Sequence, residues 1–290
     1  MDLHTNEADR ARRVKPRTFT HDFSGVPKHW FAGSAVATAL SNGVNLLFPL
    51  GEQFFIRSVR HYASRFEQDR ERMELIRGFY GQEGRHSREH ERFFARMKEH
   101  GFEIDTFLRW YDRIAYGVFE RITPAPVRLS TTAALEHFTA ILAAYALADG
   151  ELDDADPRMQ EFLKWHAAEE LEHKAVAYDV LQSVDDRYAV RLAGLAMGTA
   201  MLGSWWCVAT FLLLRQEGIS VPEAIAELRA LRAKQAAQTG KERDIGRDVF
   251  WKGIKEYAQP GFHPDNTDDY HLARQYFDER RAREASAHAA

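Results

Sequence analysis

The chain has 290 residues, of which 45% are hydrophobic and 28% charged, a composition typical of folded globular proteins rather than disordered ones. Its formal net charge is −4, so it lacks the basic excess of nucleic-acid-binding proteins and we expect no nucleic-acid partner. The only cysteine, Cys207, stands in an apolar stretch, which excludes an intrachain disulfide and favours a buried thiol. The N-terminal stretch from Met1 to Phe23 lacks the apolar segment of a secretion signal, so we expect a cytoplasmic protein.

Apolar residues recur at helical spacing between about residues 30 and 250, which predicts an all-α fold. Pro124 and Pro126 should stop the third helix, and Ser130 is the expected N-cap of the fourth. Gly101 stands where the second helix should end. The expected helices, in chain order, span about 35–66, 69–100, 106–121, 130–148, 157–183, 192–214 and 221–238.

The segment 192–214 contains no charged residue and is bracketed by Arg191 and Arg215. Such a run is long enough to span a membrane. Glycines and hydroxyl residues dilute its hydrophobicity, and a helix that is apolar all round can also be a core or oligomer-interface helix. We therefore favour a buried or interface helix, with a homodimer as one form of it, and keep membrane contact through 192–214 as the alternative.

Two segments contain the sequence Glu-x-x-His, Glu83–His86 and Glu170–His173. Residues three apart on a helix lie on one side of it, so each pair can reach one ion or neighbouring ions. Each pair follows a lone glutamate in an apolar stretch: Glu52 precedes the first pair and Glu136 precedes the second, at nearly the same separation. The chain therefore contains a two-fold repeat of helix, turn and helix.

This spacing carries the chain along one helix and back down the next to the same level. One Glu on each of two helices and Glu-x-x-His on the other two is the ligand pattern of dinuclear carboxylate bundles. We thus predict a ferritin-like four-helix bundle with additional helices, over residues 31–239, with a polar N-terminal tail at 1–30 and a peripheral C-terminal segment at 240–290. The predicted metal ligands are Glu52, Glu83, His86, Glu136, Glu170 and His173.

Further polar residues share the ligand helices. His90 lies one turn after His86, and His166 lies one turn before Glu170, so either could be an extra ligand; the alternative is a hydrogen-bonding or surface role. Glu169 should lie behind the ligands or at the surface. Glu172 should face away from the site, because it projects far from Glu170 around the helix axis.

Three segments resemble a bacterial family whose members are usually called predicted metal-dependent hydrolases. They are Phe48–Phe55, Gln82–His90 and Trp165–Lys174, and the stretch Tyr257–Pro264 is similar to that family's ending. The resemblance covers roughly residues 30–270. It implies a ferritin-like bundle with metal at the Glu and His positions given above.

Four carboxylates and two imidazoles form a hard ligand set, which favours two iron ions, then manganese, with zinc least suited. Such a site predicts an oxygenase or oxidase that acts on a hydrophobic or aromatic small molecule, with an electron donor as partner. A metal-dependent hydrolase is the alternative that the family resemblance implies. A non-catalytic metal-binding protein is the third interpretation.

Overall fold

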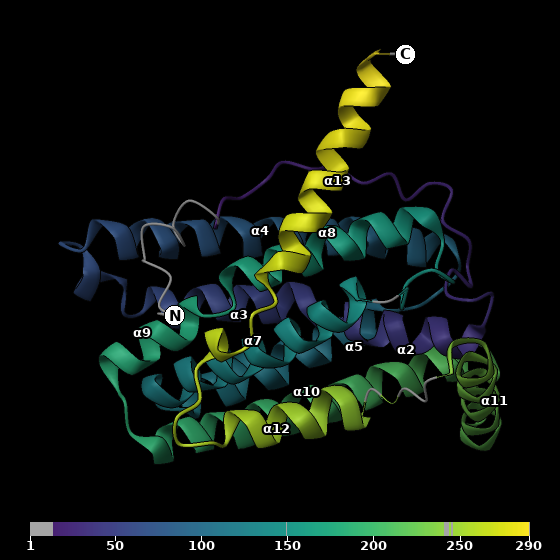
Figure 1. Ribbon diagram of the computed structural model, residues 1–290. Helices are drawn as coiled ribbons and strands as arrows, with labels where there is room; N and C mark the ends of the chain where they lie inside the picture. Colours follow the sequence, from purple (N-terminus) through teal and green to yellow (C-terminus); the bar gives the residue numbers. More distant parts are fainter. Residues whose placement is uncertain (1–13, 149, 241–243, 245, 290) are drawn as a thin grey trace.

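The computed structural model describes residues 14–148, 150–240, 244 and 246–289, and this part of the chain is helical with no strand (Figure 1). A single antiparallel bridge joins Phe31 to Ala155. The α-helices are α2 (Ala35–Asn45), α3 (Phe48–Arg60), α4 (Arg70–Glu99), α5 (Asp105–Tyr111), α6 (Glu120–Ile122), α7 (Ala125–Leu147), α8 (Pro157–His173), α9 (Val176–Val184), α10 (Tyr188–Gln216), α11 (Val221–Thr239), α12 (Lys252–Tyr257) and α13 (Tyr270–Ala289). Two segments are 3-10 helices, η1 (Ala63–Phe66) and η4 (Pro264–Asn266), and two are π-helices, η2 (Asp112–Phe119) and η3 (Gly246–Trp251).

Four helices form the centre of the molecule, with α3 packed against α4 and α7 packed against α8. Helix α3 also touches α7, and α4 touches α8, so the four helices surround one interior. Figure 1 shows α4 and α8 side by side in one layer, with α3 and α7 below them. The all-α prediction is confirmed, whereas the specific ferritin-like arrangement stays a prediction.

Several predicted helix boundaries were wrong, and proline explains two of them. The expected helix 35–66 divides at Leu46 and Leu47, because Pro49 stands in the first turn of α3, where a missing N–H costs nothing. Likewise Pro126 lies in the first turn of α7, which starts at Ala125 rather than after Ser130. The Ser130 hydroxyl donates to the Val190 carbonyl oxygen at 2.9 Å instead of capping a helix.

The expected helix 157–183 also divides, after His173, into α8 and α9. At this break Lys174 is buried, its ammonium donating to the Thr267 carbonyl oxygen at 2.7 Å and pairing with Asp269. The segment after η4 is thereby held against the end of α8.

Helix α10, the apolar segment, lies along α7 and α2. A Cβ at Gly194 would come within 2.1 Å of the Ser130 hydroxyl oxygen, so glycine is what allows α10 to approach α7 this closely. The side of α10 that faces away from α7 and α2 is exposed, since only 28% of the most apolar 18-residue stretch of this helix is buried. It is the one helix among the described residues that is long and apolar enough to cross a membrane. It is therefore not a buried core helix, and an oligomer or membrane contact stays a prediction.

Cys207, on the same helix, is exposed, so the prediction of a buried thiol was wrong. An apolar sequence does not reveal which side of a surface helix faces solvent, because α10 is apolar all round.

The two ends of the described chain pack against the bundle. Phe23, Val26 and Trp30 are buried in the core formed with α4 and α8, and α13 lies against α8. On the other side, α12 and η3 pack on α7 and bury Tyr257. The division into tail, domain and C-terminal segment stays a prediction, but the described residues of both ends help to enclose the interior.

Candidate metal centre

Each of the four central helices places an acidic residue in the interior. Glu52 on α3 is 1% exposed and Glu136 on α7 is fully buried. Helices α4 and α8 contribute the Glu-x-x-His pairs, with both members of each pair facing inward and at most 4% exposed. Buried carboxylates at this density require compensation by cations or protons.

One ligand group consists of Glu83, Glu136, Glu170 and His173, whose ligand atoms all lie within 4.8 Å of one another. Its centre is the Nε2 atom of His173, which is 2.9 Å from Glu83 Oε1, 3.4 Å from Glu136 Oε2 and 3.6 Å from Glu170 Oε2. Three carboxylates and one imidazole thus converge from α4, α7 and α8. We call this the carboxylate-rich group.

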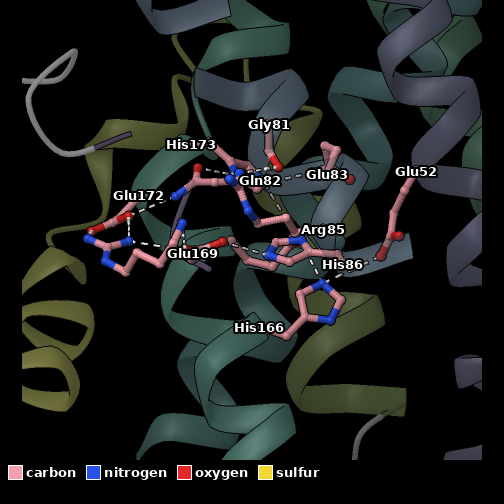
Figure 2. Close-up of polar contacts among 12 residues, drawn as sticks. Glu52, Gly81, Gln82, Glu83, Arg85, His86, His166, Glu169, Glu172 and His173 are labelled. Carbon is pink, nitrogen blue, oxygen red and sulfur yellow. Dashed lines mark hydrogen bonds and ion pairs between the residues drawn. The ribbon is translucent and has the colours of Figure 1, made fainter. Parts of the chain in front are cut away.

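The other group consists of Glu52, His86 and His166, again with ligand atoms within 4.8 Å of one another. His166 Nε2 lies 3.7 Å from Glu52 Oε1. Behind it, His166 Nδ1 lies 2.9 Å from His90 Nε2, so His90 contacts the imidazole rather than the centre of the group. Figure 2 shows the His86 and His166 rings close together, with Glu52 beside them. We call this the imidazole-rich group.

Glu170 lies between the two groups. Its Oε1 atom is 2.9 Å from His166 Nε2 and 3.4 Å from His86 Nδ1, whereas its Oε2 atom faces His173. One carboxylate can therefore serve an ion in each group, as a bridging ligand does. All six ligands predicted from the sequence are brought together, His166 joins them, and their role as ligands stays a prediction.

A second layer of hydrogen bonds surrounds both groups, and sequence reasoning missed most of it. His173 Nδ1 contacts Gln82 Oε1 at 3.0 Å, and the Gln82 amide nitrogen donates to Glu172 at 2.9 Å. His86 Nε2 contacts Glu169 Oε2 at 3.1 Å. Such contacts fix the orientation of ligating imidazoles.

Arg17 closes this layer from outside the bundle, because its guanidinium donates to Glu169 at 3.2 Å and to Glu172 at 2.6 and 2.7 Å. Figure 2 shows Glu169 and Glu172 beside Gln82 and His86. Glu172 does point away from the ligand atoms, as expected, but it is buried and linked to His173 through Gln82. The position of Gln82 directly before the first Glu-x-x-His was the only signal in the sequence. Arg17 is distant in the sequence from both of its partners and gave none.

Buried polar atoms that have no hydrogen-bond partner show whether metal ions would fit this site. Unsatisfied buried atoms are expensive in a protein interior and are normally rare. Here they gather at the two groups, which is what a site shaped for cations predicts. They include both carboxylate oxygens of Glu52, Glu83 and Glu136, together with Glu170 Oε2, His86 Nδ1 and His173 Nε2.

The ionisation of these groups without a cation supports the same conclusion. Burial raises the pKa of Glu52, Glu83 and Glu136, which means that these carboxylates resist carrying charge unless a cation is present. Burial also raises the pKa of Glu170, but the contacts with His173 and His166 outweigh it and hold that pKa well below its usual range.

The pKa values of the histidines are shifted in different directions, depending on which charged groups lie beside each ring. Burial lowers the pKa of His86, yet its contacts with Glu169 and Glu170 outweigh burial and raise the pKa to about 10. Burial lowers the pKa of His173 as well, and Glu170 and Glu136 reverse it. In contrast, burial and the charge of His86 lower the pKa of His166 to about 4. A neutral imidazole, as His166 is at pH 7, is the form that binds metal.

Comparison with known proteins agrees with this donor set. Residues 15–268 match the protein family described as predicted metal-dependent hydrolase. The chain belongs to this family. No curated protein and no solved structure matches it. For a member of the predicted metal-dependent hydrolases, two buried Glu and His groups are the expected place for the metal.

A largely apolar cavity leads to the imidazole-rich group. It is a hollow that opens to solvent and is lined mainly by aliphatic, methionine and aromatic side chains. Glu52 forms part of its wall, and so does Phe119, which is 42% exposed. The cavity therefore connects the surface to one of the predicted ligands.

Proposed function

We propose that this protein is a two-metal hydrolase that acts on a small molecule with an apolar body. The observation that carries the proposal is the convergence of seven buried Glu and His ligand candidates in two adjoining groups, in a chain of the predicted metal-dependent hydrolase family. The sequence favoured an oxygenase or oxidase; family membership gives more support to hydrolysis. The cavity at Glu52 favours an enzyme over a metal site without catalytic function.

The residues fit two divalent ions. Glu83, Glu136, Glu170 and His173 would hold one ion, and Glu52, His86, His166 and the second oxygen of Glu170 would hold the other. Hard carboxylate oxygens with imidazoles suit iron or manganese more than zinc. Two bound ions would polarise a substrate oxygen and activate water as a nucleophile.

The chain's own groups prepare this site. Glu169 and Gln82 orient the His86 and His173 rings, which limits the rearrangement needed when ions bind. The buried helices exclude bulk water from the carboxylate-rich group, and the cavity brings a substrate to Glu52 on the other side. We infer that the reacting bond lies beside Glu52.

The test is turnover of a panel of esters, amides and phosphoesters with apolar groups, measured without oxygen after loading with iron, manganese or zinc. We expect hydrolysis in the loaded protein, and none after Glu170→Ala, which removes the shared carboxylate. Glu161→Ala on the exposed part of the same helix is the control. Absence of anaerobic hydrolysis across the panel with metal bound would refute the proposal.

A second candidate is the oxygenase or oxidase predicted from the sequence, and the apolar cavity wall favours it. A reactive oxidant is best confined where few side chains can quench it and water is excluded. The same panel, extended to unactivated hydrophobic and aromatic compounds, distinguishes the two. Turnover that requires both oxygen and a reductant would select this candidate and imply an electron donor as partner.

A further inference from the structure

The wall of the cavity at Glu52 offers few free hydrogen-bonding groups. Each hydroxyl on it is already engaged within the protein. Tyr111 and Tyr116 bond to each other at 2.7 Å, while Thr123, Thr131 and Thr139 donate to backbone carbonyl oxygens of nearby helical residues at 2.6 to 3.1 Å. Most of the remaining surface comes from aliphatic, methionine and phenylalanine side chains. Such a wall selects an apolar chain, because a polar substituent would lose its water without gaining a partner.

Three charged residues lie on the wall, and one of them, an arginine, has no carboxylate partner among the described residues. Glu52 belongs to the imidazole-rich group. Glu120 is neutralised by Arg57, with nitrogen to oxygen distances of 2.7 and 3.1 Å. The third charged residue, Arg128, donates to the backbone carbonyl oxygens of Glu120 and Thr123 at 3.1 and 3.4 Å. Within the described part of the chain no carboxylate pairs with Arg128, so its positive charge remains available to a ligand.

We propose that this cavity binds an amphiphile with an unbranched apolar chain and an anionic head group, such as a medium-chain carboxylate. The head group contacts Arg128, and the chain lies along the apolar wall beside Glu52. Arginine is suited to this role because its planar guanidinium donates in parallel to carboxylate oxygens. A carboxylate of this kind has no hydrolysable bond and is the ligand that defines the pocket; a substrate of the hydrolase proposed above would carry, in addition, an ester or amide bond in the part of its chain beside Glu52. Turnover of such a substrate rests on that proposal, whereas binding of the amphiphile does not require metal.

Binding is measured by titration calorimetry on the full chain, metal-free and metal-loaded, with decanoate, butanoate and decan-1-ol as probes. We expect decanoate to bind much more tightly than butanoate, because only the longer chain can cover the apolar side chains that line the cavity. Met201→Trp or Met197→Trp, which fill the cavity from α10, should weaken decanoate binding about tenfold or more. Leu212→Trp is the matched control, since Leu212 is on the same helix, exposed and outside the cavity.

Arg128 is tested by its effect on the head group alone. Arg128→Gln should weaken decanoate about tenfold while leaving decan-1-ol unchanged, and Arg128→Lys should restore most of the preference for the acid. Arg121→Gln, an exposed arginine outside the cavity, is the control. Thermal unfolding of each variant verifies that it is folded.

Equal binding of decanoate and butanoate, or equal effects of Met201→Trp and Leu212→Trp, would overturn the inference. An Arg128→Gln variant that loses decanoate and decan-1-ol alike would overturn the role of the head group. Metal content, measured by elemental analysis on the same samples, separates the two proposals. Amphiphile binding in a chain that takes up no metal would refute the two-metal function and leave the cavity assignment standing.

Discussion

The two ligand groups differ in both donors and surroundings. The carboxylate-rich group has one imidazole, His173, and lies deep between α4, α7 and α8. The imidazole-rich group has two, and Glu52 connects it to the cavity. We infer that an ion in the first group is shielded, while an ion in the second faces the substrate.

The difference comes from two departures within the sequence repeat. One turn before Glu170 stands His166, whereas one turn before Glu83 stands Phe79, whose ring packs edge-on against His173 at 5.1 Å between centroids. One turn after His86 stands His90, and the matching residue after His173 is Ala177. The repeat thus supplies the ligands that both halves share. The two differences add histidines at the imidazole-rich group and place the apolar Phe79 and Ala177 at the matching positions of the other half.

The largest effect should come from Glu170→Ala, because Glu170 contacts histidines of both groups. We expect metal content to fall from about two ions per chain to nearly none. Elemental analysis after iron-supplemented expression is the measurement, with Glu161→Ala as control. Retention of one ion would show that Glu170 serves only one group.

Replacing the histidines one at a time should separate the groups. His166→Phe copies the residue at the matching position in the repeat and should remove the ion beside the cavity, leaving about one per chain. His173→Phe should remove the shielded ion instead. If His166→Phe keeps both ions, His166 is not a ligand and the two groups are more alike than their donors suggest.

Changes in the surrounding hydrogen bonds should weaken metal binding without abolishing it. Glu169→Gln loosens the support of His86, and Gln82→Met that of His173. Losses of about 10- to 100-fold in metal affinity are typical of such changes. Competition with a chelator measures the affinity. No change in either variant would mean that packing alone orients the rings.

The smallest effect concerns pH and the metal-free protein. Above pH about 7 the folded chain keeps a proton on His86, whose pKa is raised to about 10 by its contacts with Glu169 and Glu170, while the unfolded chain has released it. The free energy of unfolding should therefore fall as pH rises, by about 1.4 kcal/mol per pH unit for each retained proton. The opposing contribution of His166 is confined to lower pH, since its pKa is about 4 when folded and near 6.5 when unfolded.

Urea unfolding between pH 7 and 9, with chelator present, measures this slope. Metal-loaded protein should show a smaller slope, because ions replace the protons. A metal-free protein that becomes more stable over this interval would show that His86 does not retain its proton in the folded chain.

Much of the fold and site could be predicted because both depend on helical spacing. The Glu-x-x-His pairs and the lone glutamates identified four helices and six converging side chains. The orientation of α10 and the contacts of Arg17 could not be predicted, since they depend on packing between segments distant in the sequence. The proline errors had a different cause: the expected helix 35–66 ran through Pro49, and Pro126 was taken only as the end of the preceding helix, although proline also starts helices.

The hydrogen bonds behind His86 and His173 determine which tautomer each ring adopts in its neutral form. Glu169 can only accept, so the proton of His86 resides on Nε2 and Nδ1 faces Glu170. Gln82 donates to Glu172 and accepts from His173, so the proton of His173 resides on Nδ1 and Nε2 faces the carboxylates. The two histidines of the repeat therefore present opposite ring nitrogens to the metal centre, a difference that nitrogen NMR of the metal-loaded chain, with a diamagnetic ion, would register as two distinct imidazole patterns.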